Sequence, residues 1–480
     1  MNTATSSLSF FIFAVILLRR LSPTGAATCH PDDESGLLAF KSGITRDPSG
    51  LLKTWTKGTD CCKWFGITCR SGARVNSLSL SGEFDAVAAA GFSGTFSPAL
   101  AKLQHLDSIY FSYLRNLTGK FPEFLFRLPA LDIVYIDHNG LSGSIPANVG
   151  ALSRLFVFSF EGNRFTGPIP SSISNLTQLG QLKLGGNRLT GNLPLGLANL
   201  KSLSYLAVDG NRLSGNIPDF FKSFTDLNIL NLSRNAFSGK IPPSIASLAP
   251  KLRYLELGHN NLSGTIPEYL GNFKSLDTLD LSWNRFTGTV PKSFSNLTKI
   301  FNLDLSHNLL IDPFPVMNVK GIESLDLSYN QFHLKSIPKW VTSSPIIYSL
   351  KLAKCGIKMR FDDWKPAETY FYDFIDLSEN EITGSPANFL NQTEYLKEFR
   401  ASGNKLSFDL GKIKFAKTLK TLDLSRNSVF GKVPATVAGL QTLNVSYNHL
   451  CGKLPATKFP ASSFAGNDCL CGSPLPPCKA

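Results

Sequence analysis

One phrase recurs along most of the chain and constrains its fold more than any other feature. It reads LFVFSFEGNRFTGPIP at 155–170, LSYLAVDGNRLSGNIP at 203–218 and LDTLDLSWNRFTGTVP at 276–291. The shared template is L-x-x-L-x-L-x-x-N-x-L-x-G-x-I-P. Its Asn lies at 139, 163, 187, 211, 235, 260, 284, 308, 330, 380, 404, 427 and 448, and Cys355 takes one place in the series. A period in the low twenties predicts that each copy is one coil of a stacked solenoid.

The positions of the template have separate physical roles. The L-x-L segment predicts a short strand whose Leu side chains point inward while the x side chains face outward. Each buried Leu contributes about 1.5–3 kcal/mol, so the stacked coils build one long core. The Asn turns into that core, where its amide must bond neighbouring backbone groups as a ladder. In the same place Cys355 is expected to be a buried, unpaired thiol.

Period and wording together resemble leucine-rich repeats. The resemblance implies an α/β repeat solenoid, a right-handed curved superhelix with short parallel strands on its concave face and disulfide-stapled caps. The concave face carries the outward x side chains, and partners are expected to bind there. Counting irregular opening coils, the repeats fill 74–455 in about sixteen coils.

Eight of the nine cysteines form two clusters of four that flank the repeats. They are Cys29, Cys61, Cys62, Cys69, Cys451, Cys469, Cys471 and Cys478. Even clusters of this kind predict disulfide-bonded caps at 28–73 and 456–480, and an oxidising compartment. Zinc binding by either cluster is disfavoured, because exported thiols are normally oxidised. We predict no metal and no cofactor.

The N-terminal sequence also indicates export from the cell. Leu8 to Leu18 is an apolar run of signal-peptide length, and Gly25-Ala26-Ala27 supplies small residues for cleavage, so 1–27 is predicted to be a signal peptide. A retained anchor is the alternative, because Arg19 and Arg20 follow the run and no basic residue precedes it. No later stretch is apolar enough for a membrane span. The mature chain is expected to be secreted, in the extracellular space or cell wall or at the plasma-membrane surface.

Two cap sequences carry a further resemblance. W-x-x-x-x-D-C-C-x-W-x-G-I-x-C at 55–69 is similar to the N-terminal cap of plant extracellular leucine-rich-repeat proteins. SSFAGNDCLCGSPLPPC at 462–478 is similar to the C-terminal cap of polygalacturonase-inhibiting proteins, and the length is nearer their longer secreted relatives, the DNA-damage-repair/toleration-like proteins. The resemblance implies the pairs Cys29–Cys61, Cys62–Cys69, Cys451–Cys469 and Cys471–Cys478. In the front cap, Leu37, Phe40 and Ile44 predict a helix capped by Asp32 or Asp33.

Catalysis is not expected. The seven histidines are scattered, and no metal-ligand spacing, phosphate loop or nucleophile motif occurs. Formal charge is +13, from 48 basic and 35 acidic residues, which favours acidic partners such as pectin. An exported protein would not meet nucleic acid.

Two columns on the concave face are the candidate binding site. Four successive coils carry a carboxylate between the inward Leu residues and a ring directly before the ladder Asn. The carboxylates are Glu256, Asp280, Asp304 and Asp326, and the rings are His259, Trp283, His307 and Tyr329. Rings with a polar group are favoured at interfaces, and carboxylates could pair with a partner's Lys or Arg. The alternative for the carboxylates is a solvated strand position without a partner.

Seven N-x-S/T sequons predict glycosylation in an exported protein. They begin at Asn116, Asn175, Asn231, Asn261, Asn296, Asn391 and Asn444. Together these features predict a non-catalytic recognition protein of the plant cell wall that binds or inhibits a microbial wall-degrading enzyme such as polygalacturonase. The alternatives are a ligand-binding or co-receptor ectodomain working with a receptor kinase, and a structural wall or ice-associated protein.

Overall fold

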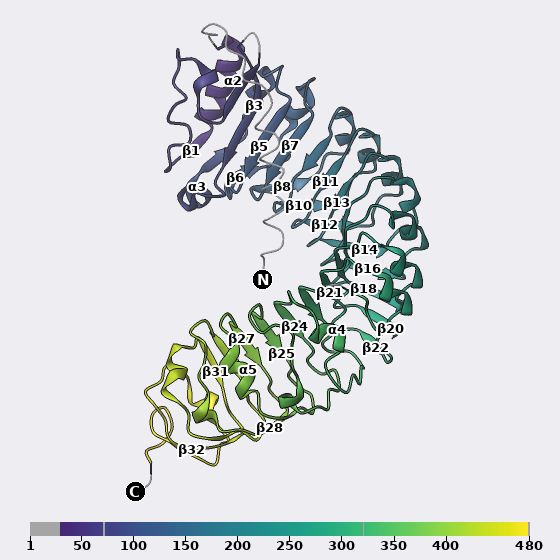
Figure 1. Ribbon diagram of the computed structural model, residues 1–480. Coiled ribbons are helices and arrows are strands. Elements are labelled where there is room, and N and C mark those ends of the chain that lie inside the picture. Colours follow the sequence, from purple (N-terminus) through teal and green to yellow (C-terminus); the bar gives the residue numbers. More distant parts are fainter. Residues whose placement is uncertain (1–28, 71–72, 320, 479–480) are drawn as a thin grey trace.

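The coils follow one another in a curved arc from the front cap to the back cap (Figure 1). The structure is a computed structural model that describes residues 29–70, 73–319 and 321–478. The predicted signal peptide, 1–27, lies outside the described residues. Buried Leu, Ile, Val and Phe side chains from every coil form one continuous core.

A long parallel sheet lines the concave side. Its strands are β3(Arg74–Ser81), β5(Ser108–Ser112), β7(Ile133–Asp137), β9(Val157–Ser159), β11(Gln181–Lys183), β13(Tyr205–Ala207), β15(Ile229–Asn231), β17(Tyr254–Glu256), β19(Thr278–Asp280), β21(Asn302–Asp304), β23(Ser324–Asp326), β24(Ser349–Lys351), β25(Phe374–Asp376), β27(Glu398–Arg400), β29(Thr421–Asp423) and β31(Thr442–Asn444). Strand β2(Ile67–Arg70) of the front cap pairs antiparallel with β3. Equivalent template positions face each other across the pairs, as Leu255, Leu279 and Leu303 do. This register places each template position in a column along the solenoid.

A second sheet runs beside the first. It contains β1(Ile44–Arg46), β4(Ser93–Thr95), β6(Asn116–Gly119), β8(Gly140–Ser144), β10(Arg164–Gly167), β12(Arg188–Gly191), β14(Arg212–Asn216), β16(Ala236–Gly239), β18(Asn261–Thr265), β20(Arg285–Thr289) and β22(Leu309–Ile311). It stops at β22, where the next two coils lose the template Gly and Pro313 supplies no N–H. Shorter pairings resume in β26(Thr383–Gly384) with β28(Lys405–Leu406), and in β30(Phe430–Gly431), β32(His449–Lys453) and β33(Cys469–Cys471).

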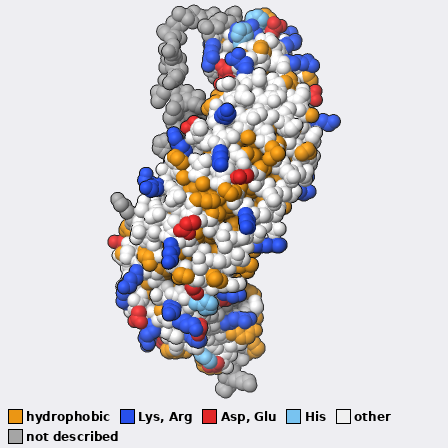
Figure 2. Space-filling view, turned by 90° about the vertical axis from the view of Figure 1, so that its right-hand side faces the viewer, with side chains coloured by type: hydrophobic (Ala, Val, Ile, Leu, Met, Phe, Trp, Pro, Cys, Tyr) orange, Lys and Arg blue, Asp and Glu red, His pale blue; other side chains and the backbone are white. Residues whose placement is uncertain are grey.

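The remaining segments of the coils are mostly short 3-10 turns that begin near the template Pro. They are η1(Cys61–Lys63), η2(Pro98–Lys102), η3(Glu123–Arg127), η4(Val149–Ala151), η5(Ser171–Asn175), η6(Leu195–Asn199), η7(Phe221–Ser223), η8(Pro243–Leu248), η9(Glu268–Asn272), η10(Lys292–Asn296), η11(Phe361–Asp363), η12(Leu410–Lys412), η13(Ala435–Gly439) and η14(Ala461–Phe464). The α-helices are α2(Pro31–Ser42), α3(Ala86–Gly91), α4(Lys339–Thr342) and α5(Ala387–Gln392). On the convex side, Lys and Arg side chains are spread out, with hydrophobic groups between them (Figure 2).

The predicted asparagine ladder is present in the core. Asn308 accepts a hydrogen bond from Phe286 N (3.0 Å) and donates to three carbonyls, the closest being that of Leu281 (2.9 Å). Cys355 is buried and unpaired as predicted, and its thiol donates to Leu327 O (3.4 Å). The ladder extends one rung further than the sequence indicated: Asn467 accepts from Leu450 N, inside the segment assigned to the back cap.

The caps are closed by disulfides. Cys29 bonds to Cys61, Cys62 to Cys69, Cys451 to Cys469 and Cys471 to Cys478, which are the pairs that the resemblance implied.

One detail of the front cap was predicted wrongly. The side chain that caps α2 belongs to His30, which accepts from Asp32 N. Asp33 instead turns inward: its fully buried carboxylate accepts two hydrogen bonds from the Arg74 guanidinium (2.9 and 3.0 Å) and one from Val75 N (2.9 Å). A buried carboxylate needs such partners, so the contact with the first coil decides where Asp33 points.

Candidate partner-binding surface

The residue directly before each ladder Asn has a left-handed backbone conformation. The φ angles are 55° at His259, 50° at Trp283, 52° at His307 and 56° at Tyr329. This region costs a non-glycine residue roughly 1 kcal/mol or more. Three successive coils closer to the N-terminus avoid that cost with Gly162, Gly186 and Gly210. The same conformation occurs outside these four coils, for example at Arg234, Glu379 and Tyr447, so it belongs to the coil itself and does not by itself mark a functional position.

The four predicted rings form one continuous stack, named here the ring ladder (His259, Trp283, His307 and Tyr329). Neighbouring ring centroids lie 5.4, 3.7 and 4.5 Å apart in chain order, with interplanar angles of 11°, 18° and 17°. Trp283 is 50% exposed, and the other three rings are half-buried. The Tyr329 hydroxyl donates to the Glu379 carboxylate at 3.1 Å. The ring ladder is thus a rigid, partly exposed aromatic surface of the kind found at interface hot spots.

The ring ladder is uncharged near neutral pH. Burial lowers the pKa of His259, and the cation of Arg234 lowers it further. Burial also lowers the pKa of His307, against the opposing effect of Asp326. Both imidazoles therefore present neutral nitrogen atoms that can donate or accept hydrogen bonds.

The predicted carboxylates lie in the neighbouring column, here named the acidic column (Glu256, Asp280, Asp304 and Asp326). They face one another across consecutive strand pairs and are half-buried. Burial raises the pKa of Glu256 to about 7 and those of Asp304 and Asp326 to about 6. The adjacent carboxylates in the column add to each of these shifts.

The structure gives the acidic column a local role that neither sequence interpretation anticipated. Asp280 and Asp304 each accept hydrogen bonds from the backbone N–H and the hydroxyl of the Ser two residues later, at 2.6 to 2.9 Å. Asp326 bonds Ser328 N and lies 3.5 Å from the Lys351 ammonium. The carboxylates thus hold the turn that presents the ring ladder, so their oxygens are partly occupied before any partner arrives. Their contact with a partner stays a prediction.

A polar cluster on the N-terminal part of the same face was not predicted from the sequence. Lys183 lies 3.2 Å from Glu161, and its ammonium lies 5.8 and 5.4 Å from the ring centroids of Tyr135 and Tyr205. The buried Asp137 carboxylate accepts from the Ser159 hydroxyl at 2.8 Å, and burial raises its pKa to about 7. Tyr135, Ser159 and Lys183 share one template position, but the residue type changes from coil to coil, so no repeated residue type in the sequence could reveal the cluster.

The seven sequons lie in two environments. Those at Asn116, Asn175, Asn261, Asn296 and Asn391 expose the asparagine. Asn231 and Asn444 are half-buried in concave strands, and each accepts hydrogen bonds from a Ser N–H and hydroxyl. A glycan attached to either of these residues would have to project from the concave face.

We therefore expect peptide mapping of protein from a plant host to find glycans at the five exposed sequons and none at Asn231 or Asn444. Full occupancy of Asn231 would contradict this expectation. It would also mean that a glycan shields the concave face beside the acidic column.

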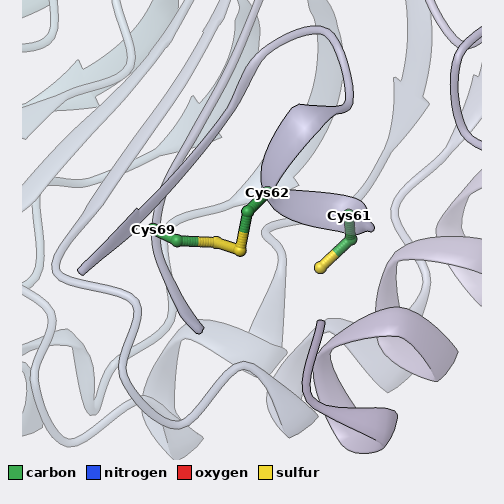
Figure 3. A group of neighbouring side chains, drawn as sticks. All are labelled: Cys61, Cys62 and Cys69. Atoms are coloured by element: carbon green, nitrogen blue, oxygen red, sulfur yellow. A yellow bond between two sulfur atoms is a disulfide. The ribbon is translucent and has the colours of Figure 1, made fainter. Parts of the chain in front are cut away.

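Three cysteine sulfur atoms of the front cap, those of Cys61, Cys62 and Cys69, lie within 4.8 Å of one another. Figure 3 shows Cys62 bonded to Cys69, with the Cys61 sulfur nearby but not part of that bond. Cys61 is bonded to Cys29. Disulfide sulfurs are not thiolate ligands, so the grouping is a structural staple and not a metal site.

Three family models match the chain. The model described as "Leucine rich repeat N-terminal domain" matches 30–70, "Leucine rich repeat" matches 201–262 and 250–310, and "Leucine Rich Repeat" matches 154–176. These matches coincide with the disulfide-bonded front cap and with coils of the asparagine ladder.

The chain has the leucine-rich-repeat solenoid fold.

Within that class it resembles plant extracellular members. It is 36% identical to the DNA damage-repair/toleration protein DRT100 of Arabidopsis thaliana over 119 residues, which cover 23% of this chain and 32% of the relative. It is 39% identical to polygalacturonase inhibitor 1 of Phaseolus vulgaris over 112 residues, 22% of this chain and 33% of the relative. The chain thus spans about one third of the length of the curated relatives that it matches.

Solved structures match over a much longer stretch. PEPR1 in its complex with AtPEP1 aligns with a TM-score of 0.61 and 27% identity, covering 92% of this chain and 69% of that one. The Arabidopsis receptor kinase HAESA, in complex with the peptide hormone IDA and the co-receptor SERK1, aligns with a TM-score of 0.55 and 25% identity, covering 92% and 98%. The proteins that this chain resembles thus include polygalacturonase inhibitors and receptor kinases. Within the described part of the chain, no helix has the length and apolarity of a membrane span.

Proposed function

We propose that this leucine-rich-repeat protein is a secreted recognition protein of the plant cell wall that binds, and thereby inhibits, a microbial wall-degrading enzyme such as a polygalacturonase. The ring ladder is the binding surface, and its continuous stack of rings is the observation that carries the proposal. The similarity to polygalacturonase inhibitors supports the choice of partner class. The formal charge of +13 would hold the protein to acidic pectin near that enzyme.

The direct test is inhibition. The purified, disulfide-bonded chain is added to a panel of fungal polygalacturonases, and reducing-sugar release from polygalacturonate is measured at several salt concentrations. We expect concentration-dependent inhibition of at least one enzyme. Absence of inhibition and of binding across the panel would reject this function.

The ring ladder is tested by replacing Trp283 and Tyr329 together with Gly. Glycine occupies the equivalent position at 162, 186 and 210, so the backbone accepts it and the folding strain falls. Interface Trp and Tyr residues commonly contribute about 2 kcal/mol each, so we expect at least about a hundredfold loss of partner affinity. Biolayer interferometry against the inhibited enzyme measures the affinity of the variant.

Tyr447→Gly is the matched control, because Tyr447 has the same left-handed conformation and 56% exposure but lies outside the ring ladder. Its affinity should stay within about twofold of the unchanged protein. Equal losses in the control and the double variant would remove the ring ladder from the proposed site.

The second candidate is a ligand-binding or co-receptor ectodomain that works with a receptor kinase. The solved-structure comparison favours it, since peptide-receptor complexes match over 92% of this chain. Co-purification of an intact receptor kinase from plant membranes, without inhibition of any polygalacturonase, would favour this candidate over the first.

A further inference from the structure

Two exposed tyrosines from neighbouring coils meet in the C-terminal half of the chain, outside the ring ladder. Tyr370 precedes β25 and Tyr395 precedes β27, and these two strands are paired (Figure 1). The Tyr370 hydroxyl donates a hydrogen bond to the Tyr395 hydroxyl at 3.0 Å, and the ring centroids lie 4.5 Å apart at an interplanar angle of 60°. The two residues are 48% and 47% exposed. Two phenol groups therefore touch at their hydroxyl ends on a surface that solvent reaches.

The packing of these coils does not depend on the exposed pair. Their core is filled by the buried rings of Trp364, Tyr372 and Phe389. The Phe389 centroid lies 5.1 Å from that of Trp364 and 5.6 Å from that of Tyr372. An exposed hydroxyl can bond water equally well, so the contact between the two surface phenols contributes little to the free energy of folding. A structural role therefore leaves the pair unexplained.

The backbone on both sides of the contact is anchored. Tyr370 lies two residues before the buried Tyr372, and Tyr395 directly precedes the buried Leu396. Beyond these residues, β25 and β27 pair in parallel register. The fold therefore holds the two phenols beside each other, and their approach does not depend on chance encounters of mobile segments.

We propose that Tyr370 and Tyr395 are a site of oxidative cross-linking, at which a haem peroxidase and hydrogen peroxide join the two rings as dityrosine. Each phenol gives the hydrogen atom of its hydroxyl to the peroxidase, leaving a phenoxyl radical whose unpaired electron is shared with the ring carbons next to the oxygen. One such carbon from each ring forms the new C–C bond, and the hydrogen on each joined carbon then moves as a proton to restore the hydroxyl. Overall, two tyrosines are oxidised by one hydrogen peroxide, which is reduced to two waters.

The geometry selects this pair over the other tyrosines. The carbons that couple lie next to the hydroxyl, so rings that touch at their hydroxyl ends bring those carbons together, and fixed contact favours coupling within one chain. The other tyrosine pair in ring contact among the described residues, Tyr110 and Tyr135, is half-buried and stacks nearly parallel at 5.5 Å and 13°. Tyr447 is exposed, but its ring lies beside the Arg426 guanidinium and not beside a second phenol.

The cross-link would join two coils where the second sheet is interrupted. Tyr370 and Tyr395 end the coils that begin with β24 and β25, and on the side of the second sheet these coils are connected by the isolated bridge between Arg360 and Thr383. The disulfides of the described chain lie near its two ends. A covalent bond that closes a loop restricts the unfolded chain, as a disulfide does. Dityrosine would thus act as a staple in the interior of the solenoid.

The inference goes beyond the proposed function and uses other residues, so either can fail without the other. The full disulfide-bonded chain is treated at high dilution with a haem peroxidase and limiting hydrogen peroxide, and the monomer is isolated by size-exclusion chromatography in denaturant. The blue fluorescence of dityrosine measures the yield. Cleavage after Glu separates the two tyrosines into fragments 369–379 and 395–398, so mass spectrometry should find these fragments joined with the loss of two hydrogen atoms.

We expect Tyr370→Phe and Tyr395→Phe each to lower the dityrosine yield of the monomer at least about tenfold, because the partner ring then has no phenol in contact. Phenylalanine keeps the ring, so the coils should fold as before. Tyr110→Phe and Tyr447→Phe are the matched controls for a stacked pair and for an isolated exposed tyrosine, and should keep the yield within about twofold. The proposal is overturned if the monomer carries no dityrosine, if dityrosine forms only in covalent dimers, or if Tyr370→Phe retains the yield.

Discussion

Replacing Asn308 by Ala is expected to lower the free energy of unfolding by about 3 to 5 kcal/mol. Asn308 is 6% exposed and is bonded to one backbone N–H and three carbonyls from two coils. Alanine leaves Phe286 N without this acceptor in the core, where an unpaired polar group costs about 1 to 3 kcal/mol, and Leu281 O keeps only the bond from Asn284 (3.2 Å). Urea denaturation followed by circular dichroism measures the change.

The matched control is Asn199→Ala. Asn199 is exposed at the end of η6, and its side chain makes no hydrogen bond among the described residues. We expect a change within about 0.5 kcal/mol there, as for most surface substitutions. A loss below about 1 kcal/mol for Asn308→Ala would show that water or a shifted backbone replaces the ladder bonds.

Replacing Asp304 by Asn is expected to stabilise the protein at pH 7.5 and to leave it unchanged at pH 3.5. In the folded chain, burial and the charge of Asp280 raise the Asp304 pKa to about 6, from an ordinary value near 3.8. Ionisation therefore favours the unfolded chain. The contribution of Asp304 to the stability of the natural protein should fall as the pH rises from about 4 to about 6 and then level off. Because Asp304 is only half-buried, we expect Asp304→Asn to raise the free energy of unfolding at pH 7.5 by about 1 to 2 kcal/mol.

The geometry of the turn should survive that substitution. Asn231 and Asn444 occupy the same template position and accept the same two hydrogen bonds from a following Ser. Asp423→Asn is the control, because Asp423 makes the same bonds but lies between Arg400 and Asn444 instead of other carboxylates. Equal gains for both variants, or a gain that persists at pH 3.5, would rule out charge repulsion in the acidic column.

Much of the binding surface follows from register. Once Leu255, Leu279 and Leu303 pair across parallel strands, every template position must form a column, so the period alone predicts which rings are neighbours. The ring ladder is such a case: four rings at one template position had to lie close together. Their stacking distances of 3.7 to 5.4 Å depend on side-chain rotation, which the period does not specify.

The sequence predicted less well where the charged side chains point. Asp33 was expected to cap α2 and is instead buried against Arg74, because a residue 41 positions away offers stronger partners than the local backbone does. The acidic column was expected either to await a partner or to stay solvated, yet Asp280 and Asp304 bond the turn that follows them. In both cases burial decides, because a carboxylate withdrawn from water must take hydrogen bonds from the donors that lie near it.

The sequence by itself determined the solenoid, its asparagine ladder and its columns, because a repeated pattern of buried leucines allows only one register. Only the tertiary structure revealed the Lys183 cluster, the burial of Asp33 against Arg74 and the stacking distances of the ring ladder. These features arise where unlike residues from neighbouring coils meet. Their geometry depends on packing between coils, which no single copy of the repeat encodes.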